Sequence, residues 1–271
     1  PKSRRSLWIG IATASATGGQ LLIVPLSQSI LGDYGWVSSL LALSLIAGLI
    51  VPMAFSMSGG ISLSLIKDTN LDIKQALNFA ARHSGYILLV IGFFACGFQV
   101  AFIAIHLPAY LADEGASPAV GALALMFIAL FNMIGSWTSG WLSGKYSKKY
   151  LLSMIYAARA LVMTVFISLP VEPVTVILFA ASVGFLYLST VPPTAGLVLK
   201  IFGTRYMGML YGLVFLSHQL GSFSGVWIGG WIFDYYGNYD LIWLVTILIS
   251  LTSAVLHFFI NDHPSKFFKK I

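Results

Sequence analysis

The sequence predicts an all-α protein of the polytopic membrane class, a bundle of eight spanning helices. Of its 271 residues, 58% are hydrophobic and only 9% are charged, and the mean hydropathy is +0.89. A soluble domain would be about 25% charged. Eight runs reach the length of about 20 mostly apolar residues that a helix needs to cross a bilayer. They are residues 7–29, 36–57, 86–110, 119–142, 150–169, 174–198, 206–233 and 241–260.

Positive charge is confined to one of the two sets of connections between these runs. Fourteen of the 15 Lys and Arg residues lie in it. They are Lys2, Arg4, Arg5, Lys67, Lys74, Arg82, Lys145, Lys148, Lys149, Lys200, Arg205, Lys266, Lys269 and Lys270. The opposite set, around Asp33, residues 113–114, Glu172 and residues 234–240, holds none. Because cytoplasmic loops are enriched in Lys and Arg, we expect a multi-pass protein of the cell (inner) membrane with both termini in the cytoplasm.

One long polar connection, residues 58–83, separates two spans from six. Its residues 70–81 carry apolar side chains at helical spacing, which predicts a short amphipathic helix on the membrane surface. We therefore expect three parts: residues 1–57 with two helices, the cytoplasmic loop 58–83, and residues 84–271 with six helices and a short cytoplasmic tail.

Composition and missing motifs exclude several functions. The net charge is +6, but the basic residues form small groups at span ends, which indicates membrane topology and lipid headgroups as partners and excludes nucleic acid. Cys96 is the single cysteine, and the sequence has no GxxxxGK[ST], HExxH, CxxC or GxSxG motif. All nine Asp and Glu residues lie in loops or at span ends. We expect no enzyme, cofactor or metal site; a membrane-embedded enzyme or a non-transporting sensor is the remote alternative.

Two spans contain residues that alter helix geometry. Pro192 and Pro193 predict a kink or a partly unwound turn that frees backbone carbonyls near the middle of the run 174–198. Gly221, Gly225 and Gly229 recur every four residues in the run 206–233, which predicts close approach of a neighbouring helix. A sliding surface is the alternative interpretation of this stripe.

An ionisable residue at membrane depth is a functional candidate because a charge there is costly. Arg159 lies about 14 Å into its span, near the centre of a hydrocarbon core of roughly 30 Å. Gln99, Asn132 and His218 also fall near mid-depth, on three further spans. Such convergence favours a central aqueous cavity. The alternative for Arg159 is pairing with backbone carbonyls or snorkelling to the headgroups.

Two histidines are candidates for carrying a coupling proton. His106 follows Gln99 by two helical turns and shares its face, and His218 lies in the middle of its span. An imidazole changes charge near physiological pH. The alternative is a neutral histidine that joins helices by hydrogen bonds.

Two segments resemble a known family. Residues 140–149, GWLSGKYSKK, resemble the major facilitator motif G-x-L-x-D-[RK]-x-G-[RK]-[RK], with Gly144 in place of the acid and Ser147 in place of the glycine. Residues 202–243 are similar to the eleventh helix and following loop of the monocarboxylate transporter and oxalate/formate antiporter branch. The resemblance implies that the eight spans match helices five to twelve of a twelve-helix major facilitator fold.

That fold consists of two six-helix halves with a substrate site between them. On this register residues 1–57 are the last two helices of the first half. The chain opens at Pro1 with a poor signal peptide, so we expect an internal start. The resemblance also implies a gating loop of Gly140, Lys145, Lys148 and Lys149, whose lysines hold the loop at the cytoplasmic face.

One departure bears on the substrate. Residues 132–137, NMIGSW, stand where the monocarboxylate branch has an acid and a substrate-binding arginine, so Arg159 or His218 would have to supply positive charge. We expect a monomeric secondary active transporter of a small organic solute, an organic anion such as a carboxylate, driven by symport or antiport with a proton. The expected substrate contacts are Gln99, His106, Asn132, Arg159 and His218, and the proton carriers are His106 or His218. An exporter of drug-like or amphipathic solutes is the alternative.

Overall fold

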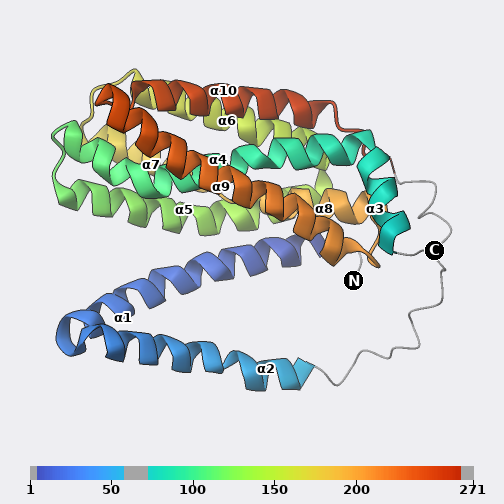
Figure 1. Cartoon of the computed structure of the whole chain (residues 1–271), viewed down its shortest axis with the longest axis horizontal. Helices are drawn as coiled ribbons and strands as arrows, with labels where there is room; N and C mark the ends of the chain where they lie inside the picture. Colours follow the sequence, from blue (N-terminus) through green and yellow to red (C-terminus); the bar gives the residue numbers. More distant parts are fainter. Residues whose placement is uncertain (1–4, 58–72, 264–271) are drawn as a thin grey trace. The chain divides into compact units, whose positions relative to one another are not determined.

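The described residues of the computed structural model form ten α-helices, and Figure 1 shows their arrangement along the chain. The structure describes residues 5–57 and 73–263, and within these ranges no strand occurs. The chain divides into two units, residues 18–71 and the remainder. The all-α prediction is confirmed.

The smaller unit contains most of α1 (Arg5–Gly48) and all of α2 (Ile50–Met57). Gly35 interrupts α1 with φ 79° and ψ 174°, a left-handed conformation that glycine adopts without steric cost. The Ser27 and Ser39 hydroxyls lie 3.0 Å apart and join the two arms beyond this turn. The connection between the first two predicted spans, residues 30–35, is therefore mostly helical and broken at one glycine.

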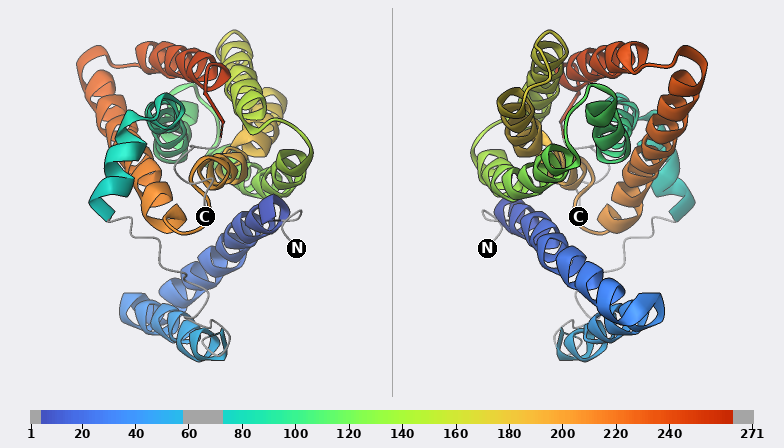
Figure 2. Two further views of the ribbon diagram at one scale, coloured as in Figure 1. Left: turned by 90° about the vertical axis from the view of Figure 1, so that its right-hand side faces the viewer. Right: turned by 90° about the vertical axis from the view of Figure 1, so that its left-hand side faces the viewer.

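The larger unit holds the six-helix bundle predicted for residues 84–271. Its elements are α4 (Ser84–Asp113), α5 (Pro118–Lys145), α6 (Lys148–Ile167), α7 (Pro173–Leu186), α8 (Val191–Phe202), α9 (Met207–Tyr236) and α10 (Asp240–Phe258). The helices α7 and α8 are the two halves of one span, Pro173–Phe202. Each of the six runs predicted between residues 86 and 260 therefore corresponds to one helix or, for 174–198, to these two half-helices. Seen along the bundle, α4 lies among α5, α9 and α10 (Figure 2).

Six helical segments of the described residues are long and apolar enough to cross a membrane. They are Ser29–Ser56, Ser84–Asp113, Pro118–Lys145, Lys148–Ile167, Pro173–Phe202 and Asp240–Phe258. Of the other two predicted spans, residues 7–29 form the first arm of α1, and residues 206–233 form the 30-residue α9, which does not meet this criterion. In α9, glycines and the polar residues Ser217, His218 and Gln219 dilute the apolar side chains.

Glycines set the closest helix contacts of the bundle. A Cβ atom on Gly97 of α4 would lie 1.8 Å from the His218 carbonyl oxygen of α9, and one on Gly221 would lie 2.1 Å from the Phe94 carbonyl oxygen. The pair α5 and α7 is equally close, since a Cβ on Gly135 would lie 1.8 Å from the Phe185 carbonyl oxygen. Close approach at the α9 glycine stripe is therefore confirmed.

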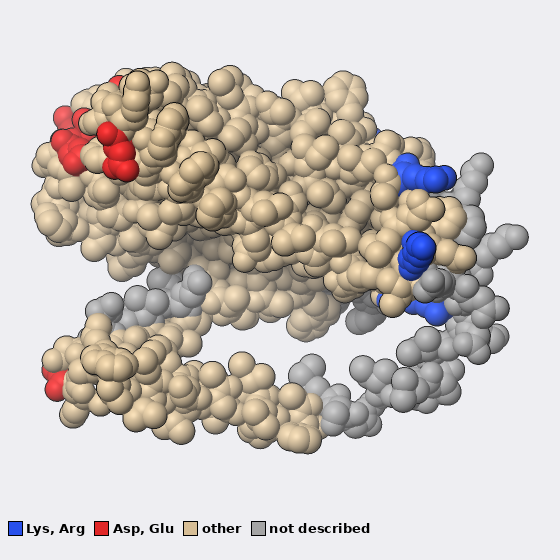
Figure 3. Space-filling model, in the orientation of Figure 1, with Lys and Arg blue, Asp and Glu red and all other residues tan. Residues whose placement is uncertain are grey.

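Opposite charges occupy opposite ends of the larger unit (Figure 3). The basic end includes α3 (Ile73–Arg82), which packs on α4 through the buried residues Ala76 and Ala80 and leaves Ile73 59% exposed. This helix confirms the second part of the predicted amphipathic helix; residues 58–72 lie outside the described residues. The separation of charge along one axis is the pattern expected of a bundle that spans a membrane.

The chain beyond α10 is tied to the same basic end. Lys149 Nζ donates to the Ile260 carbonyl oxygen at 3.0 Å, and Lys200 pairs with Asp262. Partial burial alone would raise the pKa of Asp262, but the Lys200 ammonium outweighs it and lowers that pKa. These contacts fix the basic ends of α6, α8 and α10 against one another.

We predict that Gly221→Val destabilises the bundle by about 1–3 kcal/mol or more, because the new side chain would overlap the α4 backbone. Thermal unfolding of the detergent-solubilised protein measures this. The matched control is Gly212→Val on the same helix, where no atom lies within 4 Å of a new Cβ. Equal losses in both variants would show that helix propensity, not close packing, governs the position.

Candidate functional site

The span made of α7 and α8 is interrupted between Leu186 and Val191, and most of the candidate polar residues lie around this interruption. Between α7 and α8, residues 187–190 leave the helix. Pro192 and Pro193 cannot donate to the carbonyls of Leu188 and Ser189, so an α-helix cannot continue through this turn. The Tyr187 N–H donates to the Gly184 carbonyl and the Val191 N–H to the Leu188 carbonyl, both at 3.0 Å, which tightens the chain on either side. The predicted interruption is confirmed and lies just before the prolines.

Arg159 of α6 binds the carbonyl oxygens that this turn exposes. Its Nε and Nη2 atoms donate to the Leu186 carbonyl at 3.1 and 2.6 Å, and Nη2 also donates to the Tyr187 carbonyl. Nη1 donates to Gln99 Oε1 at 3.0 Å. The side chain is only 2% exposed and stacks on the Tyr156 ring. Arg159 therefore pairs with backbone carbonyls and does not snorkel to the headgroups, the two alternatives for a structural role at this depth.

No carboxylate neutralises Arg159 within the described residues, where the ion pair present is Lys200 with Asp262. A buried charge needs compensating hydrogen bonds, and two carbonyls and an amide supply them here. The guanidinium is thus satisfied in hydrogen bonding while its net positive charge remains.

Gln99 connects Arg159 to a further helix. It is 1% exposed on α4, and its Nε2 donates to the Thr246 carbonyl of α10 at 3.2 Å. The amide therefore accepts from Arg159 on one side and donates to α10 on the other. Gln99 and Arg159, which the sequence places near mid-depth on two different spans, therefore lie in contact.

Asn132 holds the other side of the unwound turn. Its Oδ1 accepts from the Leu188 N–H at 3.0 Å and from the Ser136 hydroxyl at 3.2 Å, and its Nδ2 donates to Thr17 Oγ1 at 2.9 Å. Ser139, two turns further along α5, donates to the Ser189 carbonyl. The face of α5 that carries Asn132 thus binds both an N–H and a carbonyl of the turn.

His218 lies beside this cluster. Its ring packs between Phe93 and Phe215, with ring centroids 5.3 and 4.9 Å away, and it is 7% exposed. Nδ1 lies 3.2 Å from Gln219 Oε1, while Nε2 is buried and has no hydrogen-bond partner among the described residues. This nitrogen is thus without a hydrogen-bond partner in the described structure but is enclosed by its neighbours, so binding of a proton or a solute oxygen requires the surrounding helices to open.

His106 lies apart from the unwound turn and contacts α9 and Tyr239. Its Nε2 lies 3.0 Å from the Val226 carbonyl of α9 and its Nδ1 3.4 Å from the Tyr239 hydroxyl. Gly229 of the α9 stripe makes room for the ring. The structure brings Gln99, Asn132 and Arg159 together around the turn but engages His106 between α4 and α9 through other partners.

The segment expected to gate the cytoplasmic face keeps its lysines at the basic end. Lys145 Nζ lies 3.8 Å from the Trp141 ring centroid, the Lys148 stem covers Gly196, and Lys149 binds the Ile260 carbonyl. The position of Gly144 is open, with no atom within 4 Å of a Cβ.

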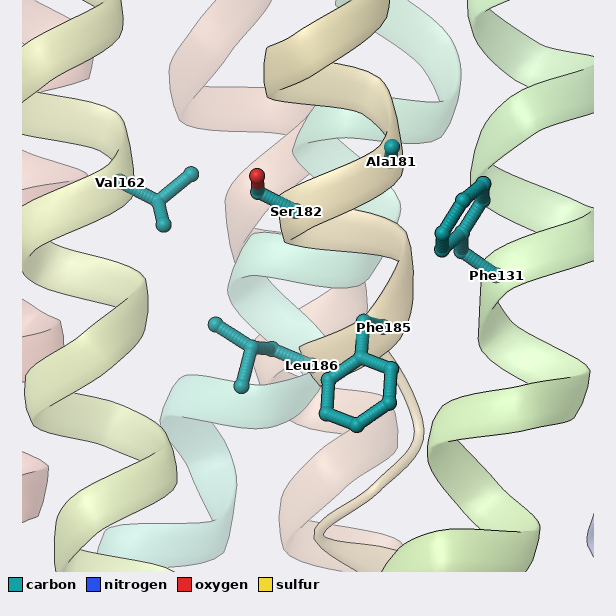
Figure 4. Close-up of a pocket in the computed structure, with 6 residues that line it drawn as sticks. All are labelled: Phe131, Val162, Ala181, Ser182, Phe185 and Leu186. Atoms are coloured by element: carbon teal, nitrogen blue, oxygen red, sulfur yellow. The ribbon is translucent and has the colours of Figure 1, made fainter.

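An open pocket lies on the other side of α7 from the buried polar side chains of Arg159 and Gln99 and is lined by neither of them. A cavity of about 360 Å³ lies between α5, α6 and α7 (Figure 4). It is lined by Phe131, Val162, Ala181, Ser182, Phe185 and Leu186. The space beside Arg159 and Gln99 is too small to hold a water molecule. In this structure the buried polar cluster therefore faces protein and not a solute-sized cavity.

Sequence reasoning missed Cys96 and Ser139. Cys96 Sγ lies 3.1 Å from Thr190 Oγ1 at the end of the turn. The signals were present, since Cys96 precedes Gln99 by three residues and Ser139 follows Asn132 by seven. A search for small polar side chains on the same helical faces would have found both.

We predict that Asn132→Leu lowers the free energy of unfolding by about 1–3 kcal/mol, because the Leu188 N–H would stay buried without an acceptor. Thermal unfolding in detergent measures the loss. Asn78→Leu, on the exposed face of α3, is the matched control. An unchanged midpoint for Asn132→Leu would mean that the turn finds another acceptor.

Comparison with known proteins identifies the family. The sequence model of the Major Facilitator Superfamily matches residues 1–226. The MFS-type transporter YcxA of Bacillus subtilis is 27% identical over 264 residues, covering 94% of this chain and 64% of its own length. Monocarboxylate transporter 13 of Rattus norvegicus is 25% identical over 265 residues, covering 94% of this chain and 61% of its own length.

A solved structure matches in fold. The Fucose:proton symporter FucP of E. coli superposes with a TM-score of 0.74 at 18% identity, covering 96% of this chain and 70% of FucP. The chain thus spans less than two thirds of the curated relatives described above. The helix order, the charge separation and the family match agree: this chain is part of a multi-pass membrane transporter fold and belongs to the Major Facilitator Superfamily.

Proposed function

We propose that the protein is a secondary active transporter that moves a small organic anion, such as a carboxylate, by alternating access. The observation that carries this proposal is Arg159, a buried guanidinium near the middle of α6 with no carboxylate partner in the described structure. The names of several relatives, among them monocarboxylate transporters 12 and 13, support the same solute class.

The sign of this charge favours an anion. In a low-dielectric bundle a charge acts over a longer range than in water, so an uncompensated cation produces a positive potential in the space around it. Dipoles of the bound carbonyls reduce the potential but cannot cancel a full charge. A carboxylate near the bundle is thereby stabilised, and a hydrophobic cation is repelled.

The five predicted site residues divide into two roles in this proposal. Gln99, Asn132 and Arg159 are engaged with protein groups, so they shape the site and set its charge. His218 has a free ring nitrogen and is the first candidate for contact with the solute or the coupling proton. His106 is the second candidate for the proton, at Tyr239 and Val226.

The expected topology completes the proposal. Residues 1–57 supply the last two helices of one half, residues 58–83 the cytoplasmic connection, and residues 84–271 the other half. Both termini lie in the cytoplasm of a cell whose inner membrane holds the protein as a monomer. The loop with Gly140, Lys145, Lys148 and Lys149 acts as the cytoplasmic gate.

A second candidate is an exporter of drug-like or amphipathic solutes. The observation in its favour is the apolar cavity of about 360 Å³ between α5, α6 and α7, lined by Phe131 and Phe185 among others (Figure 4). Such a surface suits a hydrophobic solute better than a carboxylate.

We predict that proteoliposomes with the full product of the gene encoding this chain take up a small organic acid saturably and exclude a hydrophobic cation. The assay compares radiolabelled pyruvate and oxalate with tetraphenylphosphonium, with empty liposomes as the control. Saturable movement of tetraphenylphosphonium without uptake of either acid would favour the exporter and contradict the anion proposal.

We predict that His218→Gln abolishes solute accumulation driven by a pH gradient but retains exchange of labelled for unlabelled solute. Glutamine keeps a hydrogen-bonding side chain and cannot change charge. Uptake is measured with and without the gradient, and His106→Gln serves as the parallel variant. If His218→Gln still accumulates solute and His106→Gln does not, the proton site is His106.

A further inference from the structure

The unwound turn 187–190 is held from several neighbouring helices at once. Arg159 of α6 binds the Leu186 and Tyr187 carbonyls, and Asn132 and Ser139 of α5 bind the Leu188 N–H and the Ser189 carbonyl. Cys96 of α4 lies against Thr190. The Tyr187 and Ser189 carbonyls and the Leu188 N–H of the turn thus meet buried side chains.

We propose that Arg159 is a positioning residue, whose hydrogen bonds lock the unwound turn and so fix the direction of α8 relative to α7. The link of this lock to activity rests on the proposed transport function. The lock itself rests on geometry alone. Direct binding of substrate is not the role of Arg159 in this proposal.

The chemistry of the side chain fits a lock. Three nitrogen atoms of the guanidinium donate to three different acceptors, two carbonyls of the turn and Gln99. A lysine ammonium is a point charge that cannot span acceptors on opposite edges of a plane. Carbonyls at membrane depth need internal partners because no lipid group can supply a donor. Arginine is therefore suited to this position by its shape as well as by its charge.

The two half-helices share the neighbours α5 and α6, but only α8 also packs on α9, and the turn is where the two halves can move relative to each other. α7 packs mainly on α5 and less on α6, whereas the contacts of α8 are spread over α5, α6 and α9. At the far end of α8, Lys200 pairs with Asp262 and the Lys148 stem covers Gly196. A change in the angle at the turn would move the basic end of the span while α7 stays in place.

The single cysteine of the chain reports directly on this lock. Cys96 is fully buried, and its Sγ lies 3.1 Å from Thr190 Oγ1 and 3.9 Å from Arg159 Nη2. The thiol is closed to a maleimide while the turn covers it, and opening of the turn uncovers it. The rate of labelling by N-ethylmaleimide in membranes therefore measures the open population without any knowledge of the solute.

We expect wild-type protein to label slowly and Arg159→Ala to label at least about tenfold faster, since one hydrogen bond to a charged group is worth a factor of that size. Arg159→Lys should lie between the two and serves if Arg159→Ala does not fold. The matched control is Ser250→Ala, which removes an equally buried hydroxyl that bonds only the Tyr156 carbonyl. Labelling of both Arg159 variants at the wild-type rate would overturn the proposal.

A background without the prolines separates a lock from a substrate contact. In the double variant Pro192→Ala and Pro193→Ala, two restored N–H groups let α7 and α8 join, so the turn no longer needs Arg159. Arg159→Ala should then increase labelling much less than it does with the prolines present. An equal increase in both backgrounds would refute the lock. If labelling behaves as expected but no organic acid is transported, the lock stands and the proposed function fails.

Discussion

Backbone groups inside a membrane must find partners within the protein, and this constraint explains the polar interior of the bundle. Lipid offers no donors or acceptors, so an interrupted helix has to be completed by side chains. Pro192 and Pro193 create the interruption, and the buried residues Arg159, Asn132 and Ser139 complete it. These polar side chains are therefore buried where the prolines leave backbone groups without helical partners. Their hydrogen bonds fix the shape of the unwound turn.

Close contacts at glycines join other pairs of helices in the bundle and leave little room for adjustment. Gly97 with Gly221 and Gly135 with Gly184 allow α4 to meet α9, and α5 to meet α7, at backbone distance. These glycine contacts are van der Waals contacts between backbones. The unwound turn is instead held by side-chain hydrogen bonds, which can break and form with other partners. Motion required by alternating access is thus more easily placed at the turn than at the glycine contacts, because packed surfaces tend to move as units.

The spanning helices and the interruption at Pro192 could be predicted from the sequence. The hydrogen-bond partners of the buried polar side chains could not. Proline chemistry and glycine spacing are local, so the break before Val191 and the close approach at Gly221 followed from a few residues. The depth of Arg159 could be counted, yet its partners are main-chain carbonyls, which every residue carries and no side chain reveals. His106 shares a face with Gln99 as expected, but Val226 and Tyr239 engage it from helices that no local pattern could place.

The charge and the hydrogen bonds of Arg159 act over different distances, and this difference resolves an apparent conflict about its role. The hydrogen bonds are used by Leu186, Tyr187 and Gln99 and need direct contact. The charge has no carboxylate partner in the described structure and acts through space. The resemblance to the monocarboxylate branch implies a substrate-binding arginine on the preceding span, in the run where this chain has residues 132–137 and no arginine. A cation buried one helix away can preserve the electrostatic preference for an anion without occupying the same position. The lost contact must then be made by another group, and the unpaired ring nitrogen of His218 is the one that the buried cluster leaves free.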